Sequence, residues 1–249
     1  MLQTNYLTVR SPKIAQPVTF AICPDFHNGD FETLRPLLKG VDAILVVGDL
    51  VDRHSRRDNG YDNALRFLAE APQIAPTFYS LGNHERMISG LPAYWPQVEA
   101  SDVIVLDDQF VPFGGIVLGG LSSIRVGEDA PAMAAQLAQK QPFLRAMAVQ
   151  EGFKLLMCHH PEYFVTAVQP WDIDLTIAGH AHGGQVRIGR QGLYAPGQGL
   201  LPRLTSGLYF GERLLVSRGV TNSVWAPRIH CACEIIILHL EGRADAPCD

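Results

Sequence analysis

The sequence lacks the features that mark secreted or membrane-spanning chains. Its 249 residues hold five cysteines, an odd number spread along the chain, which does not form the disulfide framework of a small secreted protein. No run approaches the ~18 uninterrupted apolar residues of a membrane-spanning helix, and residues 1–17 contain no apolar core of signal-peptide length. We therefore expect a protein of the reducing cytoplasm and leave peripheral contact with a membrane open.

Charge is also sparse, and its balance is acidic. Only 18% of the residues are charged, and the net charge is −5, which argues against a protein whose main task is to bind the phosphates of nucleic acid. The expected partner is instead a small phosphorylated substrate whose charge is neutralised by metal. The 47% of hydrophobic residues is enough for a buried core, and the sequence leaves the oligomeric state open.

Short apolar runs alternate with amphipathic stretches along the chain. The apolar runs predict strands over residues 18–23, 43–47, 77–81, 103–106, 116–118, 154–158 and 175–178. Helical spacing predicts helices over residues 31–39, 61–71, 130–139 and 143–150, with an interruption at Pro142. This alternation predicts layered sheets and helices of the α/β (α+β) class, in one domain covering residues 1–249.

The last third of the chain has extended runs without a long helical pattern. Residues 185–188, 213–217 and 234–240 are predicted to contribute to a second sheet. The Pro- and Gly-rich residues 189–211 are predicted to form a loop, and its length makes it a candidate substrate-facing segment. Its leucines either pack as core, which is the default for this residue type, or contact an acyl chain: Leu200, Leu201, Leu204 and Leu208.

Five polar segments directly follow the predicted strands: PDFH, GDLVD, GNHE, CHHP and GHAH. In open α/β sheets, the carboxyl ends of the strands are where ligands bind. The segments offer a set of oxygen and imidazole ligands: Asp25, His27, Asp49, Asn83, His159, His180 and His182. Such ligands suit two divalent ions among Mn, Fe, Zn and Mg, of which we favour Mn. Two ions sharing a carboxylate, for which Asp49 is the candidate, favour hydrolysis at phosphorus.

Each segment taken alone also has an ordinary structural explanation. Asp25 is compatible with a turn, Asp49 and Asp52 with helix caps, and Glu85 with a helix start. For Asp52, orientation of a histidine is the alternative to capping. Five segments that all follow strands favour the metal interpretation over these separate explanations.

The histidine pairs differ in what their spacing allows. In GHAH, His180 and His182 are separated by one small residue and flanked by glycines, which leaves room for a metal. The adjacent His159 and His160 would point to opposite sides at the end of a strand, so we expect only one of them to be a ligand. The pair C-x-C at residues 231–233 has no second pair, and alternation along a late strand explains it equally well.

The ordered series DFH, GDLVD, GNHE, HHP and GHAHGGQ resembles the calcineurin-like metallophosphoesterase superfamily over most of the chain. More narrowly, GHAHGGQV, GLY at residues 207–209 and VSRGVTNS at residues 216–223 resemble the bacterial branch typified by YkuE-like phosphohydrolases. Some members of that branch are membrane-associated, and some cleave the pyrophosphate of a UDP-linked diacylglucosamine lipid. The resemblance implies a four-layer sandwich of two mixed β-sheets flanked by helices.

The resemblance also implies a role for each residue of the ligand set. One metal would be held by Asp25, His27, Asp49 and His182. The other would be held by Asp49, Asn83, His159 and His180. A hydroxide bridging the metals would attack phosphorus, while His84 would bind the phosphate or protonate the leaving group. Three arginines are candidate substrate contacts: Arg86, Arg125 and Arg187.

This chain departs from the pattern of the resemblance at Pro24, Glu85 and Ala181, where relatives often have Ser, Asp and Thr, and none of these departures removes a ligand. The leading hypothesis is therefore a metal-dependent hydrolase of phosphoric esters. The alternatives within the enzyme class are a lipid-linked nucleotide pyrophosphate hydrolase and a phosphodiesterase or nuclease. The alternative outside it is a scaffold that only binds a phosphorylated ligand.

Overall fold

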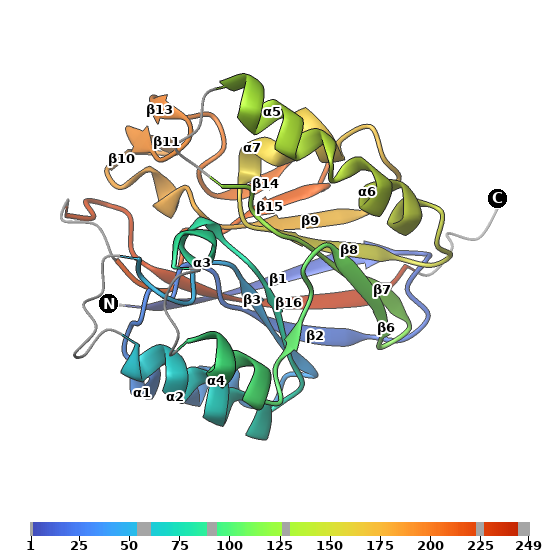
Figure 1. Cartoon of the computed structure of the whole chain (residues 1–249), viewed down its shortest axis with the longest axis horizontal. Coiled ribbons are helices and arrows are strands. Elements are labelled where there is room, and N and C mark those ends of the chain that lie inside the picture. Colours follow the sequence, from blue (N-terminus) through green and yellow to red (C-terminus); the bar gives the residue numbers. More distant parts are fainter. Residues whose placement is uncertain (1, 54–60, 89–93, 126–129, 223–226, 244–249) are drawn as a thin grey trace.

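Two six-stranded β-sheets form the centre of the molecule, and helices cover the outer face of each (Figure 1). The computed structural model describes residues 2–53, 61–88, 94–125, 130–222 and 227–243. In spatial order the first sheet contains β1 (Gln3–Ser11), β16 (Glu234–Gly242), β2 (Val18–Ile22), β3 (Ala43–Val47), β4 (Thr77–Ser80) and β5 (Ile104–Val105). The second contains β14 (Gly207–Tyr209), β15 (Leu214–Val216), β9 (Leu175–Ala178), β8 (Lys154–Cys158), β7 (Ile116–Leu121) and β6 (Gln109–Phe113).

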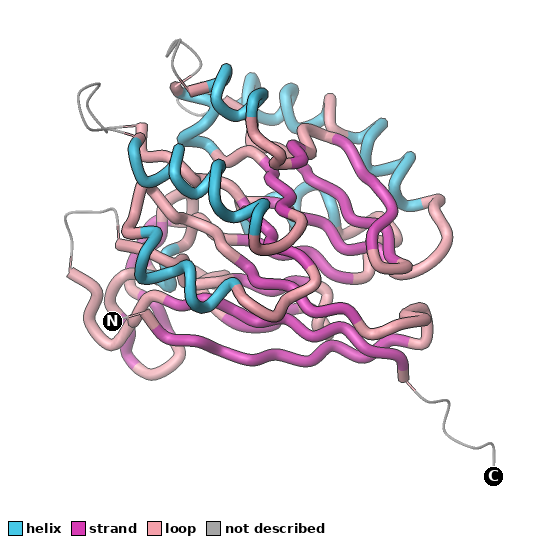
Figure 2. The backbone as a smooth tube through the Cα atoms, turned by 90° about the horizontal axis from the view of Figure 1, so that it is seen from below, coloured by secondary structure: helices cyan, strands magenta, loops and turns pink. Residues whose placement is uncertain are grey.

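Both sheets are mixed, and their strands run side by side across the molecule (Figure 2). In the first sheet β2, β3, β4 and β5 are parallel, while β16 is antiparallel to β2 and parallel to β1. In the second sheet β15, β9, β8 and β7 are parallel, and β14 and β6 pair antiparallel at its two edges. The parallel centre of each sheet directs several strand ends toward one edge.

The helices lie on the outer faces of the two sheets (Figure 1). Beside the first sheet are α1 (Phe31–Leu34), α2 (Asp62–Glu70) and α4 (Trp95–Ala100), and beside the second are α5 (Ala130–Ala138), α6 (Gln141–Ala148) and α7 (Pro161–Tyr163). The remaining elements are α3 (Asn83–Met87), η1 (Arg35–Leu38), η2 (Ala71–Gln73), η3 (Phe164–Val168), η4 (His182–Gly184), β10 (Arg187–Ile188), β11 (Gln191–Gly192), β12 (Tyr194–Ala195) and β13 (Gly199–Leu200).

Alternation of side chains along the strands builds three apolar layers. On β2, Phe20 and Ile22 pack between the sheets against Leu155 of β8, whereas Ala21 faces the helices and packs in the cluster that contains Phe67 of α2. The second sheet in turn buries its outer face against α6 and η3. The order of layers is therefore helix, sheet, sheet, helix, which confirms the predicted four-layer architecture.

The second sheet is composed differently from the prediction. Residues 234–240 do not belong to it, because β16 inserts between β1 and β2 of the first sheet. Only Arg187–Ile188 of the predicted strand at 185–188 is a strand, and it pairs in a small hairpin with β11. Residues 189–211 hold β11, β12, β13 and β14, so the prediction of a single loop there was wrong.

Two prolines change the helices that the sequence predicts. The helix predicted over 31–39 ends at Leu34 and continues as the 3₁₀ turn Arg35–Leu38, because Pro36 has no N–H to donate and its ring clashes with the carbonyl of the residue four earlier. Pro142 does not interrupt a helix but lies in the first turn of α6, where a missing N–H costs nothing.

Candidate metal centre

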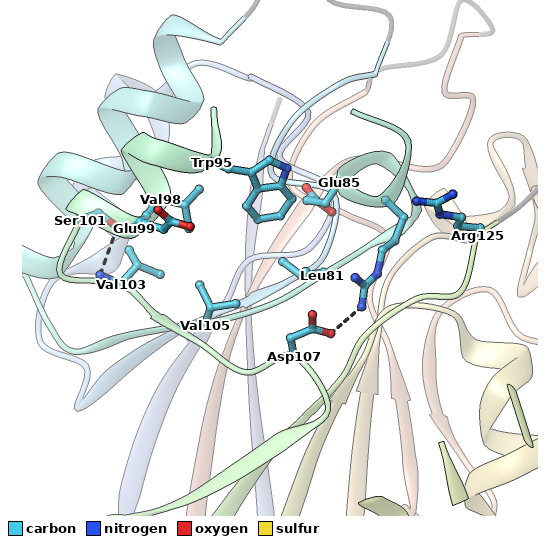
Figure 3. A pocket seen from close by; sticks show the side chains of 11 residues that line it. Leu81, Glu85, Trp95, Val98, Glu99, Ser101, Val103, Val105, Asp107 and Arg125 are labelled. Carbon is cyan, nitrogen blue, oxygen red and sulfur yellow. Dashed lines mark hydrogen bonds and ion pairs between the residues drawn. The ribbon is translucent and has the colours of Figure 1, made fainter. Parts of the chain in front are cut away.

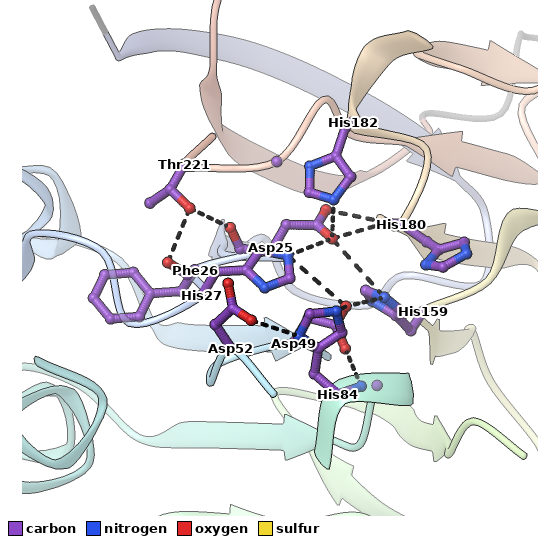
Figure 4. A network of polar contacts seen from close by, with 12 residues as sticks. Asp25, Phe26, His27, Asp49, Asp52, His84, His159, His180, His182 and Thr221 are labelled. Carbon is purple, nitrogen blue, oxygen red and sulfur yellow. Dashed lines mark hydrogen bonds and ion pairs between the residues drawn. The ribbon is translucent and has the colours of Figure 1, made fainter. Parts of the chain in front are cut away.

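Residues that follow β2, β3 and β4 of the first sheet lie beside residues that follow β8 and β9 of the second (Figure 4). The five polar segments follow these strands, and the structure brings all seven candidate ligands together. Each of the seven is at most 8% exposed, although all carry polar or charged side chains. Buried polar groups at this density require partners, and the partners here come from segments far apart in sequence.

Asp49 and His159 form the closest contact of the cluster. Nε2 of His159 lies 3.0 Å from Oδ2 of Asp49. Nδ1 of His159 donates to the carbonyl oxygen of Val47 at 2.8 Å, which fixes the orientation of the ring. A metal-binding histidine commonly donates its other ring N–H to such an acceptor, so His159 is preorganised to bind a cation through Nε2.

The residues assigned to the first metal face one another at distances that leave room for an ion. Oδ1 of Asp25 is 3.7 Å from Nε2 of His27 and 3.7 Å from Nε2 of His182. Nε2 of His27 is also 3.8 Å from Oδ2 of Asp49. Among the described residues, neither ring nitrogen of buried His27 has a hydrogen-bond partner. A divalent ion would satisfy this donor set, so the residues fit the implied metal.

His160 contacts two of the residues assigned to the second metal, Asn83 and His180. Oδ1 of Asn83 lies 3.2 Å from Nε2 of His160, and the ring of His160 stacks on that of His180 with centroids 4.0 Å apart. The backbone N–H of His180 donates to both oxygens of Asp25 at 3.1 Å, which couples this group to the first. His159 thus faces the two carboxylates, while His160 contacts the amide of Asn83.

His84 lies at the mouth of the cluster with its ring partly exposed, at 13%. Its Nδ1 accepts a hydrogen bond from the backbone N–H of Arg53 at 3.0 Å, so in the neutral ring the hydrogen is on Nε2. That Nε2 is 3.8 Å from Oδ2 of Asp49. Asp52 lies 3.6 Å from the same Nδ1, which has no hydrogen to donate in the neutral ring, so this contact places Asp52 beside His84 without a hydrogen bond through Nδ1.

Backbone strain is concentrated at the ligands. Five of the seven have a positive φ in the left-handed region: Asp25 (55°), His27 (45°), Asp49 (54°), His180 (63°) and His182 (46°). Such conformations cost non-glycine residues about 1–3 kcal/mol each and persist only where the surrounding structure enforces them. Their clustering at one edge of the sheets is typical of a functional site.

A glycine permits the two loops of the first sheet to approach closely. A Cβ atom on Gly82 would lie 2.1 Å from Oδ1 of Asp49 and 2.5 Å from its backbone nitrogen. No real side chain tolerates these distances. The glycine of the segment GNHE therefore allows Asn83 and His84 to lie beside the carboxylate of Asp49.

The charges of the cluster shift its pKa values in opposite directions. Burial would raise the pKa of Asp25, but the surrounding imidazoles, His182 foremost, outweigh it and lower that pKa to about 2. Burial disfavours protonated His159, but the Asp49 carboxylate outweighs it and raises the pKa of His159 to about 10. Burial lowers the pKa of His84 to about 4, so this ring is neutral at pH 7.

Sequence reasoning missed the supporting role of three residues around the cluster. Glu85 accepts hydrogen bonds from the backbone of the Asp49 loop. Thr221 donates through Oγ1 to the carbonyl oxygens of Asp25 and Phe26, both at 2.9 Å. Arg228 donates to Nδ1 of His182 at 3.1 Å, which leaves the hydrogen on Nε2 of a neutral ring. His182 must therefore give up this contact and carry its hydrogen on Nδ1 to bind a cation through Nε2.

The cluster opens into a cavity of about 470 Å³. Its lining includes Asp49, Asn83 and His84 from the first sheet's loops, together with Glu162, Tyr163 and Gly197. The segment 189–211 thus contributes to this cavity through Pro196 and Gly197, which connect β12 and β13.

The three candidate arginines have other surroundings. Arg125 and Arg86 line a separate cavity of about 530 Å³, with Trp95 on its wall (Figure 3). Arg86 pairs there with Asp107. Arg187 donates to the carbonyl oxygen of Gly183 and to Thr205. None of these arginines lines the cavity beside the seven candidate ligands.

The sequence is similar to one known protein family and to several individual proteins. The model of the calcineurin-like phosphoesterase family matches residues 18–184, which is more than half of the chain. An uncharacterized metallophosphoesterase of Campylobacter jejuni is 28% identical over 264 residues, covering 97% of this chain and 64% of the relative. Phosphodiesterase YaeI of Escherichia coli is 28% identical over 245 residues, covering 91% of this chain and 83% of the relative.

A third relative is the uncharacterized protein YpbG of Bacillus subtilis, which is 24% identical over 249 residues, covering 97% of this chain and 88% of the relative. The chain therefore matches most of two of these relatives but spans 64% of the length of the Campylobacter protein. Among the helices that the structure describes, none has the length and apolarity needed to traverse a bilayer.

Proposed function

Because the chain belongs to the calcineurin-like phosphoesterase family, we propose that it hydrolyses phosphoric esters with two divalent cations held by the seven clustered ligands. Mn²⁺ is the favoured ion, since the set combines carboxylate, amide oxygen and imidazole without thiolate. The observation that carries the proposal is the position of Asp49, whose Oδ2 lies within 3.8 Å of His27 and 3.0 Å of His159, one from each ligand group. When bound, such cations supply a nucleophile from water and neutralise charge on the phosphate.

The chain's own residues orient the substrate. His84 is neutral at pH 7, and its Nε2–H faces the cavity because Nδ1 is engaged by the backbone of Arg53. It therefore acts as a hydrogen-bond donor to a phosphate oxygen, and of the two roles expected for it, phosphate binding is favoured over proton delivery. The neutral amide of Asn83 avoids adding negative charge beside an anionic substrate.

The test compares two chromogenic substrates on chelator-stripped protein. We expect hydrolysis of bis-p-nitrophenyl phosphate or p-nitrophenyl phosphate to return only with Mn²⁺, and Asp49→Asn to abolish it while the far-UV circular dichroism stays unchanged. Asp42→Asn is the matched control, because Asp42 accepts a backbone N–H from Thr19 at the opposite end of β2. Two Mn²⁺ bound without turnover of any phosphoric ester would instead support a scaffold that only binds its ligand.

A second candidate is the hydrolysis of a phosphoester or pyrophosphate that carries an acyl chain, and one observation favours it. A groove of about 800 Å³, lined by Val165, Leu201 and Phe210, shares Glu162 with the cavity of the metal cluster. Leu200 and Leu201 are 81% and 64% exposed, whereas Leu204 is buried, so only part of this leucine set packs as core. Leu201, which is exposed and lines the groove, would suit an apolar substrate chain.

A further inference from the structure

Glu85 is fully buried on α3, one residue beyond His84, and its carboxylate lies between two loops. It accepts a hydrogen bond from the backbone N–H of Gly82 at 2.7 Å, within its own loop. It also accepts from the N–H of Asp49 at 2.9 Å and of Val51 at 3.3 Å, across the gap to the loop after β3. One side chain thus binds three backbone donors that belong to two different strand ends.

A second hydrogen bond crosses the same gap in the opposite direction. The backbone N–H of His84 donates to Oδ1 of Asp49 at 2.9 Å. Hydrogen bonds therefore connect the loop that carries Asp49 with the loop that carries Asn83 and His84 in both directions. Glu85 accepts from the backbone of the first loop, and Asp49 accepts from the backbone of the second. Oδ2 of Asp49 stays directed at the imidazoles of His27 and His159.

A second carboxylate buried so close to Asp49 is electrostatically costly, since like charges repel strongly away from water. An apolar side chain of similar size would avoid this repulsion but would leave three buried N–H groups without an acceptor. These three donors compensate the charge of Glu85, and they are the backbone groups that set where Asp49 and Asn83 lie.

We propose that Glu85 is a positioning residue that sets the distance and orientation of Asp49 relative to Asn83 and His84, and thereby the affinity of the centre for divalent cations. This inference rests on the proposed function in that cations bind at this cluster. Partners that orient metal ligands typically change metal affinity by about 10–100-fold when they are replaced. A carboxylate is needed because an amide at this position would turn its own N–H₂ group toward at least one of the three donors.

The experiment measures Mn²⁺ binding to chelator-stripped Glu85→Gln by isothermal titration, together with the electron paramagnetic resonance spectrum of the bound ion. We expect affinity about 10–100-fold below that of the wild type, and an altered spectrum. Asp174→Asn is the matched control, because Asp174 also accepts a backbone N–H, from Lys154 at 2.8 Å, at the far end of β8. Its Mn²⁺ affinity should equal that of the wild type.

The outcomes separate positioning from simple stabilisation. A lower melting temperature of metal-free Glu85→Gln, with wild-type Mn²⁺ affinity and spectrum, overturns the inference. Should Glu85→Gln not fold, Glu85→Asp keeps the charge but shortens the side chain, and wild-type affinity in that variant overturns the inference equally. Absence of Mn²⁺ binding by the wild-type protein would refute the proposed function itself. Equal Mn²⁺ binding by wild type and Glu85→Gln would refute only the role of Glu85.

Discussion

Binding of a cation at this centre must displace a proton from His159. Its Nε2 faces Asp49 at 3.0 Å, and the carboxylate holds the pKa of the ring at about 10 in the metal-free protein. Because pH 7 lies about three units below this pKa, the His159 ring is protonated at pH 7. Removing the proton costs roughly 4 kcal/mol, which lowers the affinity for the cation about a thousandfold. The ionised Asp49 remains as the ligand, because its own pKa is lowered well below the usual range.

The direction of the pH dependence follows from the raised pKa. Cations compete more successfully as the pH rises toward 10, so the apparent Mn²⁺ affinity should increase about tenfold per unit between pH 6.5 and 8.5. The pKa of His27 is also raised, because the carboxylates of Asp25 and Asp49 outweigh its burial, which can only steepen this slope. The ion pair of His159 with Asp49 also stabilises the metal-free fold. This stabilisation is fully present below pH 6.5, the pKa of histidine in the unfolded chain, and is lost as the pH rises through about 10.

Isothermal titration of Mn²⁺ at pH 6.5, 7.5 and 8.5, each in two buffers of different ionisation enthalpy, measures both quantities. The expected result is release of about one proton or more per chain and an affinity that climbs with pH. In His159→Gln the slope should become shallower while overall affinity falls. An affinity that is constant over this range, or binding without proton release, would refute the reasoning from His159.

Two further predictions concern the cavity and the groove beside the seven candidate ligands. In Gly197→Ala the new Cβ would lie 2.2 Å from Oε1 of Glu162, so this side chain must shift in the cavity and kcat/KM should fall. Gly199→Ala is the matched control, because Gly199 has a φ of 74°, close to the 73° of Gly197, but no atom lies within 4 Å of the added Cβ. The control should lose stability and keep its kcat/KM. If the apolar groove binds a substrate chain, decyl p-nitrophenyl phosphate should have a lower KM than the methyl ester, and Leu201→Ser but not Ile104→Ser should remove that difference. Equal KM values for the two esters would exclude the acyl-chain candidate.

The sequence predicts that the candidate ligands lie close together because their positions follow from local rules. A polar segment after a buried run lies at a strand end, and parallel strands bring such ends to one edge of a sheet. Asp25, Asp49 and His180 could thus be placed near one another without knowledge of the tertiary contacts. The strand predicted over residues 18–23 from its apolar run is likewise present, as β2.

Other parts of the site depend on contacts that no local pattern encodes. Glu85 lies within a helix start that is compatible with simple capping, and its role emerges only from the approach of residues 49–51. Arg228 is one of many arginines until folding brings it to His182, which is 46 positions earlier. β1 escaped prediction because residues 3–11 are mostly polar, as an edge strand with exposed side chains allows.

The position of β16 between β1 and β2 has a consequence for how the protein is made. Gln3 pairs with Glu234, so β1 acquires its neighbour only after residues 234–242 have been synthesised. Until then β1 has no strand beside it, and β2 has only β3. Because pairing over such separations is slow and leaves strand edges exposed, the nascent protein should depend on chaperones that shield these edges until residue 242 has been added.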